Sequence, residues 1–179
     1  MKTKLVYIFL VLLTFAGLNS SFAQNGKNKL LITQKGDTIP EPLGYVNDFE
    51  KIFNANEIQI LTNTIKDFEG KTGIQIAILT TDTSMVTSER FENFVVAVGN
   101  KWGVGKKDEN NGIVIGFSKG YRKIRISNGY GIEKLISDKE TKGIIEDHFI
   151  PYFKKNEYYQ GTFEGLKSLI ELLKTKLDK

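Results

Sequence analysis

The chain contains no cysteine among its 179 residues, and it contains one histidine and three prolines. Without cysteine it can form no disulfide, no haem thioether link and no lipid attachment through a lipobox thiol, and thiol catalysis is excluded as well. The single histidine, His148, does not support a catalytic triad or a histidine phosphatase. The fold must therefore be held together by noncovalent packing.

The chain also lacks an excess of charge that would identify a partner. Its formal net charge is +4, and lysines and arginines are interleaved with acidic residues, without a basic stripe that carries aromatic residues. Such a stripe is typical of nucleic-acid binding, so no nucleic-acid partner is expected. With 40% apolar and 26% charged residues, the composition is that of one folded domain.

The N-terminal segment has the pattern of a secretory signal peptide. Residues 1–4 carry two lysines, residues 5–18 form an uncharged apolar run, and Ser21 and Ala23 place small residues where a signal peptidase cleaves. We expect cleavage before Gln24 and a periplasmic or secreted protein, with an uncleaved anchor as the alternative. No second long apolar run follows, so the mature chain is predicted to lack a membrane span.

We divide the chain into a signal peptide (1–23), a leader and linker (24–44) and one domain (45–179). The predicted elements are a strand at 45–46, a helix from Asn54 or Asn56 to Gly70, a strand at 74–79, a helix from Ser88 to Gly103, strands at 113–118 and 121–127, a helix from Ser137 to Pro151, and a last helix over 159–177. This order predicts an α/β fold, a three-layer α/β/α sandwich with a mixed central sheet of about four strands.

The strands at 113–118 and 121–127 are predicted to form a β-hairpin that turns at Lys119-Gly120. A hairpin places its two outer ends side by side, so the segment 106–112 should lie against the segment 128–133. Together these two segments carry a high density of oxygen ligands and glycines. We call the place where they meet the hairpin mouth.

The hairpin mouth is a candidate site for a divalent cation. Calcium takes six to eight oxygen ligands from carboxylates, amides and backbone carbonyls in a flexible loop. The candidate ligands at the mouth are Asp108, Glu109, Asn110, Asn111 and Glu133. Gly112, Gly129 and Gly131 are expected to let the backbone approach closely or adopt positive φ. The alternative is an ordinary solvated turn, because the spacing is not that of an EF-hand.

Several blocks of the sequence resemble the TPM domain family. They are Val46-Asn47-Asp48, Trp102-Gly103-Val104-Gly105 with Asn111-Gly112-Ile113, and residues 122–126 followed by 129–133 and Asp138. The resemblance covers about residues 45–161 and implies a central sheet between helical layers, export from the cytoplasm, and an acidic pocket that binds divalent ions, calcium among them. Members include a chloroplast lumen protein described as an acid phosphatase. Asn110 stands where the family often has aspartate, which removes one charge.

Asp48 and Asp82 follow strands that a helix connects, so these two carboxylates should share one edge of the sheet. Whether the hairpin mouth lies at that edge depends on which hairpin strand runs parallel to residues 74–79. The usual rule for a strand, helix, strand connection places the mouth at the opposite edge. Because the resemblance implies one acidic pocket among these blocks, we nevertheless predict a single pocket that joins Asp48 to the mouth.

The functional prediction is an exported domain that binds a divalent cation, calcium first and Mg²⁺ as an alternative. Its role would be that of an interaction or cell-envelope maintenance module with an envelope protein as partner. The alternative is a metal-dependent acid phosphatase, with a metal-activated water or else Asp48 or Asp108 as nucleophile, and with Arg122 or Lys106 holding the phosphate. A structural domain without a ligand is the third possibility. A nucleotide cofactor is not expected, because Lys134 replaces the third glycine of a dinucleotide fingerprint.

Overall fold

The structure is a computed structural model that describes residues 37–106 and 108–178. The predicted signal peptide and most of the predicted leader lie outside the described residues. Of the described residues, none belongs to a helix that is both long enough and apolar enough to cross a membrane.

The centre of the fold is a mixed sheet of four strands in the order β1-β2-β3-β4. The strands are β1 (Val46–Asp48), β2 (Gln75–Thr80), β3 (Gly112–Ser118) and β4 (Lys123–Asn128). β1 and β2 pair in parallel, β2 and β3 pair in parallel, and β3 and β4 form the predicted antiparallel hairpin. The sheet therefore confirms the predicted α/β class. The hairpin connection spans residues 119–122, two residues more than predicted, and Arg122 takes a φ of 52° to close it.

The helical elements surround this sheet. They are α1 (Ala55–Thr72), the 3₁₀ turn η1 (Ser88–Arg90), α2 (Phe91–Trp102), α3 (Tyr130–Glu133), α4 (Asp138–Ile144), the π-helical turn η2 (Ile145–Phe149), α5 (Ile150–Phe153) and α6 (Tyr158–Leu177). Local sequence explains several ends. Asn54, one of the two predicted starts of its helix, and Ser137 each begin a helix, and each forms a capping box. α1 passes Gly70 and ends instead at Gly73, whose φ of 74° suits the left-handed cap.

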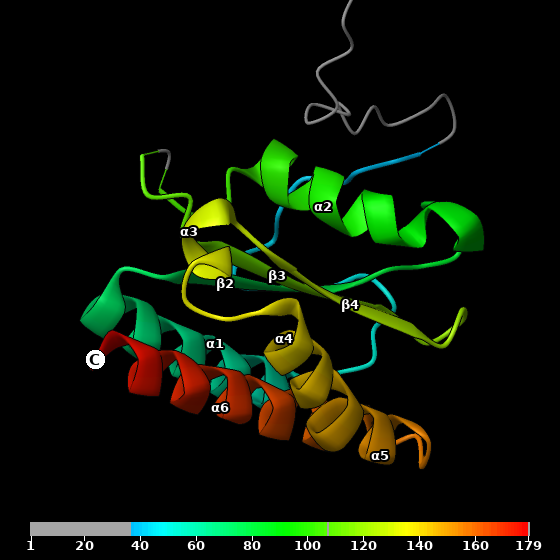
Figure 1. Cartoon of the computed structure of the whole chain (residues 1–179). Helices are drawn as coiled ribbons and strands as arrows, with labels where there is room; N and C mark the ends of the chain where they lie inside the picture. Colours follow the sequence, from blue (N-terminus) through cyan, green and yellow to red (C-terminus); the bar gives the residue numbers. More distant parts are fainter. Residues whose placement is uncertain (1–36, 107, 179) are drawn as a thin grey trace, which may run out of the picture. The chain divides into compact units, whose positions relative to one another are not determined.

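Helices cover both faces of the sheet, so the fold has three layers (Figure 1). On one face, β2 and β3 contribute Ile76, Ile78 and Ile115 to a core that includes Leu61 of α1 and Leu169 of α6. On the other face, the core between the sheet and α2 contains buried side chains from β2, β3 and α2. α4, η2 and α5 pack beside α6. The two cores confirm the predicted sandwich.

The two crossover connections, from β1 to β2 and from β2 to β3, have opposite handedness. β1, β2 and β3 lie in chain order across the sheet, so crossovers of one hand would place α1 and α2 on the same face. α1 and α2 instead lie on opposite faces. One of the two crossovers is therefore left-handed, which is rare among parallel connections. The arrangement lets two consecutive helices cover both faces of a narrow sheet.

The helix that was predicted to stop at Pro151 continues past it. A π-helical turn, η2, separates α4 from α5, and Pro151 occupies the first turn of α5, where a missing N–H costs little. α5 ends at Phe153, followed by Asn156 with a φ of 63°. The prediction failed because proline ends a continuous α-helix but is accepted where a π turn starts a new segment.

Candidate functional site

The structure separates Asp48 from the hairpin mouth. In the register of the sheet, Asp48 pairs with Thr80 at one end of β2, while Gly112 pairs with Gln75 at the other end. Five residues of strand place these ends about 16 Å apart. The predicted single pocket is therefore wrong. The physical reason is the parallel pairing of β2 with β3, which follows the usual rule and sends the mouth to the opposite edge.

At the mouth, Asn111 and Glu109 are engaged with the protein itself. The buried Asn111 side chain donates from Nδ2 to Gly73 O at 2.9 Å and to Glu109 Oε2 at 2.6 Å. Its Oδ1 accepts from Lys106 N at 2.8 Å, and Glu109 Oε1 lies 3.2 Å from Lys106 Nζ. These contacts hold the loop before β3 against the end of α1. The two side chains act here as structural ties within the loop.

Gly112, Gly129 and Gly131, the three glycines of the mouth, allow backbone segments to pack closely against one another. A Cβ added to Gly112 would overlap Val104 O, and a Cβ on Gly129 or Gly131 would overlap a carbonyl oxygen of the loop before β3. None of the three is among the described glycines with positive φ. The predicted close approach is therefore confirmed, and the predicted positive φ is wrong.

The other predicted ligands at the mouth lie on the surface. Asp108, Asn110 and Glu133 are exposed. Asn110 has a φ of 49°, and its carbonyl oxygen accepts from Gly131 N at 3.0 Å. In residues 37–106 and 108–178, no three side chains of histidine, aspartate or glutamate converge as a metal-binding group. The mouth is thus a packed junction with carboxylates on its outer side.

The opposite end of the sheet gathers a second set of oxygen atoms, at the carboxyl ends of β1, β2 and β3. We call it the carboxyl edge. Asp48 Oδ1 accepts from Thr80 Oγ1 at 2.7 Å, and Asp48 Oδ2 accepts from Phe53 N at 2.7 Å. Thr80 Oγ1 also accepts from Glu50 N at 2.9 Å. In α/β proteins, ligands bind outside the carboxyl ends of parallel strands. This edge is therefore the better candidate site.

Glu50 ties the loop after β1 to the hairpin turn. Its carboxylate accepts from Lys119 N at 2.9 Å, from Gly120 N at 3.2 Å and from Ser118 Oγ at 3.4 Å. Burial raises the pKa of Glu50, these hydrogen bonds oppose the rise, and the nearby charge of Asp82 adds to it. Glu50 was missed at the sequence level. The sequence feature that could have indicated Glu50 is its position two residues after Asp48, the last residue of β1.

Asp82, after β2, adds a further carboxylate at the carboxyl edge. Its Oδ1 accepts from Ser84 N at 2.8 Å, and hydrogen bonds from Ser84 lower the pKa of Asp82. Across the described part of the chain, Asp48, Glu50 and Asp82 take part in no ion pair. No ion pair with a described side chain therefore offsets the charge of these three carboxylates, and Lys51 and Lys119 line a pocket together with Glu50.

Comparison with known proteins gives a family and a fold. The model of the TPM domain matches residues 46–172. No curated protein matches the chain. The fold is similar to the N-terminal domain of a P. gingivalis protein, with a TM-score of 0.68 and 24% identity over 75% of this chain and 84% of that one.

Two other solved structures share the fold. The BA42 protein of the psychrophilic bacterium Bizionia argentinensis has a TM-score of 0.61 and 20% identity, over 72% of this chain and 86% of that one. The N-terminal domain of the cg2496 protein of Corynebacterium glutamicum has a TM-score of 0.56 and 13% identity, over 75% and 85%. Since the family model covers most of the described residues, this chain belongs to the TPM domain family.

Proposed function

We propose that this chain is an exported TPM domain that binds a divalent cation at its carboxyl edge and acts as an interaction or envelope-maintenance module. The observation that carries the proposal is the group of Asp48, Glu50 and Asp82, which lie at the ends of β1 and β2 without an ion-pair partner in the described residues. A cation would neutralise this charge. It would also offset the repulsion that Asp82 exerts on Glu50.

The chemistry of the donors at this edge fits a hard cation. Carboxylates, the hydroxyls of Thr80 and Ser118, and backbone carbonyls are oxygen ligands of the kind that Ca²⁺ and Mg²⁺ prefer. Because no group of three acidic or histidine side chains converges in the described residues, water would complete the shell. Mg²⁺ commonly binds through one or two carboxylates with several waters, so both ions belong in the test.

Export is the second part of the proposal. It is supported by the signal-peptide pattern of residues 1–23, with two lysines, an apolar run and small residues before Gln24. We place the mature domain in the periplasm or outside the cell, where an envelope protein would be its partner. Retention of the N-terminal segment in the mature protein, read by mass spectrometry, would contradict this assignment.

The alternative function is a metal-dependent acid phosphatase. One of its predicted combinations uses Asp48 as nucleophile and Arg122 as phosphate ligand. Asp48 ends β1, and Arg122 lies in the hairpin connection just before β4, so the two residues belong to the outer strands of the sheet or their ends. Three strand spacings separate their backbones by about 14 Å. That separation counts against this combination. Release of phosphate from p-nitrophenyl phosphate that depends on the cation and on Asp48 would reverse the choice.

The binding proposal is tested by thermal unfolding with chelator, Ca²⁺ or Mg²⁺. At a hundredfold excess over its dissociation constant, a bound ion stabilises the fold by about 2.7 kcal/mol. We expect this gain in the wild type and in Asp108→Asn at the mouth, and its loss in Asp48→Asn. The measured quantity is the ion-induced shift within each variant, so a lower starting stability of Asp48→Asn does not affect the result. A gain that survives Asp48→Asn but not Asp108→Asn would contradict the assignment.

A further inference from the structure

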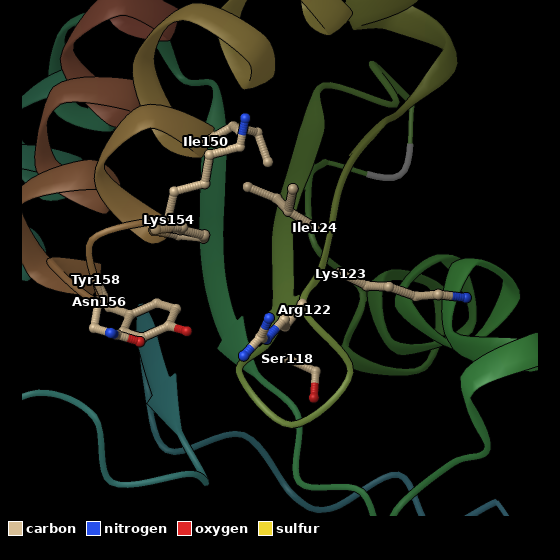
Figure 2. Close-up of a pocket in the computed structure, with 9 residues that line it drawn as sticks. Ser118, Arg122, Lys123, Ile124, Ile150, Lys154, Asn156 and Tyr158 are labelled. Carbon is tan, nitrogen blue, oxygen red and sulfur yellow. The ribbon is translucent and has the colours of Figure 1, made fainter.

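A pocket of about 370 Å³ opens beside the hairpin turn, between the start of β4 and the segment from η2 to α6. Figure 2 shows its lining residues, which come from the end of β3, the turn, β4 and the segment around α5. This volume is within the range of small-molecule sites, which is about 300–1,000 Å³. None of Asp48, Glu50 and Asp82 lines the pocket, and Ser118, which does line it, donates to Glu50 at 3.4 Å.

The charge of the lining is positive. Arg122, Lys123 and Lys154 line the pocket, and none of its lining residues is acidic. Lys123 is engaged elsewhere, because its Nζ donates to Ser88 O at 2.6 Å and its side chain points away from the other lining residues (Figure 2). Arg122 and Lys154 form no ion pair with any described residue. Two basic groups at the pocket thus have no anionic partner.

The walls of the pocket are apolar and partly aromatic. Ile124 and Ile150 lie on one part of the lining, and Phe153 and Tyr158 form another. The rings of Phe153 and Tyr158 have centroids 4.9 Å apart. An inorganic anion would leave these walls in contact with water, and a neutral apolar molecule would leave Arg122 and Lys154 without a partner. The combination fits an anion that carries a flat apolar body.

Two of the residues that line this pocket have positive φ. Arg122 and Asn156, which both line it, have φ values of 52° and 63°. Positive φ is disfavoured for arginine and tolerated by asparagine, and disfavoured backbone is found at binding sites where the surrounding structure fixes it. The π-helical turn η2 comes immediately before Ile150 and sets the direction in which α5 presents Ile150, Phe153 and Lys154.

We infer that this pocket binds a small organic anion, with a carboxylate or phosphate group that pairs with Arg122, an apolar ring that packs on Phe153 and Tyr158, and Lys154 adding to the positive charge of the lining. A guanidinium fork matches either headgroup through two hydrogen bonds. The inference does not rest on the cation, because the pocket lining contains no carboxylate.

The test is an amide NMR titration of the protein in the presence of chelator, with four probes. Phenylacetate and phenyl phosphate carry both parts of the proposed ligand, inorganic phosphate carries only the charge, and benzyl alcohol carries only the ring. We expect saturable shifts at Arg122, Ile124 and residues 153–158 with at least one of the first two probes, and binding at least about tenfold weaker for the last two. The tighter of the first two probes identifies the headgroup.

Three variants make the test specific to the pocket. Arg122→Asn removes the guanidinium but keeps a residue that tolerates positive φ, so the hairpin should remain folded. It should weaken binding about tenfold or more. Lys154→Gln should weaken it as well. Lys155→Gln is the matched control, because it removes the same charge from a residue outside the pocket lining whose Nζ lies over the Tyr152 ring.

Three results would overturn the inference. The first is that neither aromatic anion shifts the pocket amides. The second is equal affinity for inorganic phosphate or benzyl alcohol, which would show that charge or ring alone accounts for binding. The third is an equal loss of affinity in Lys154→Gln and Lys155→Gln, which would indicate a general charge effect. Because chelator is present throughout, each of these results is independent of whether the carboxyl edge binds a cation.

Discussion

At the scale of single residues, two glycines in helices differ in how much space surrounds them. Gly165 of α6 faces the buried ring of Phe149, and an added Cβ would overlap that ring. For Gly143 of α4, nothing beyond its chain neighbours and the backbone of its own helix lies within 4 Å of the place where a Cβ would be. The same substitution at these two positions therefore compares a crowded site with an open one, in the same type of secondary structure.

We predict that Gly165→Ala lowers the free energy of unfolding by about 2 kcal/mol, because the cost of overpacking exceeds the gain in helix propensity. Gly143→Ala should raise it by about 0.5–1 kcal/mol, because only the propensity gain applies. Urea unfolding of the two variants measures both changes. Equal stabilisation by the two alanines would contradict the packing of α6 against η2.

The sequence identified polar residues that do lie at the hairpin mouth, but it did not show which of them are hydrogen-bonded within the protein. Asn111 and Glu109 are polar groups at the predicted hairpin mouth, yet their hydrogen bonds go to Gly73 O, Lys106 and each other. A sequence shows which oxygens are present. It does not show which of them the fold uses internally, because that depends on contacts such as that of Asn111 with Gly73, 38 residues apart in sequence.

At the scale of elements, the start of α4 is joined to the end of α6. Glu140 closes the capping box of α4 with Ser137, and its Oε1 lies 2.6 Å from Lys176 Nζ. Lys176 and the hydrogen bonds from Ser137 lower the pKa of Glu140 to about 2. The carboxylate is thus stabilised in the folded state, by contacts that an unfolded chain lacks.

The lowered pKa gives a pH dependence with a defined sign. Because the folded pKa lies below the unfolded value of about 4.3, the stabilisation from Glu140 is fully present above that value. It should be lost as the pH falls from about 4.3 towards about 2. Denaturant unfolding of the wild type and Glu140→Gln should show a difference at pH 6 that closes over this range. A difference that stays constant down to pH 2 would contradict the contact.

The ends of helices and strands could be predicted well where they depend on residues nearby in the sequence. The starts of α1 and α4 and the pairing of the hairpin were visible as local patterns. The continuation beyond Pro151 was not, because the π turn that permits it is stabilised by packing of η2 on α6. The length of the hairpin connection was also missed, because Arg122 adopts a φ that its side chain disfavours.

At the scale of the whole molecule, the direction of β3 decides where a site can form. Parallel pairing of β2 with β3 divides the predicted ligands into two groups at opposite ends of the sheet. Family membership and the three-layer fold are confirmed, since both follow from patterns spread along the chain. The predicted position of the acidic pocket was wrong because it depended on the direction of β3 relative to β2. For that direction we had set aside the usual rule for a strand, helix, strand connection.

The whole fold also supports our proposal of a ligand site at the carboxyl edge and not at the mouth. At the mouth, backbone segments pack so closely that three glycines are needed. At the carboxyl edge, loops from three strands meet through side chains, with Glu50 joining the loop after β1 to the hairpin turn. Side-chain contacts of this kind can rearrange around an ion more readily than packed backbone.

The central claim is that a divalent cation binds at the carboxyl edge. The most direct test is a residue-resolved amide NMR titration of the chelator-treated protein with Ca²⁺ and then with Mg²⁺. We predict saturating shifts at residues 48–53, 80–82 and 119–120, with unchanged amides at residues 108–112 and 129–133. Shifts confined to the hairpin mouth, or no shifts at millimolar concentrations of either ion, would contradict the claim.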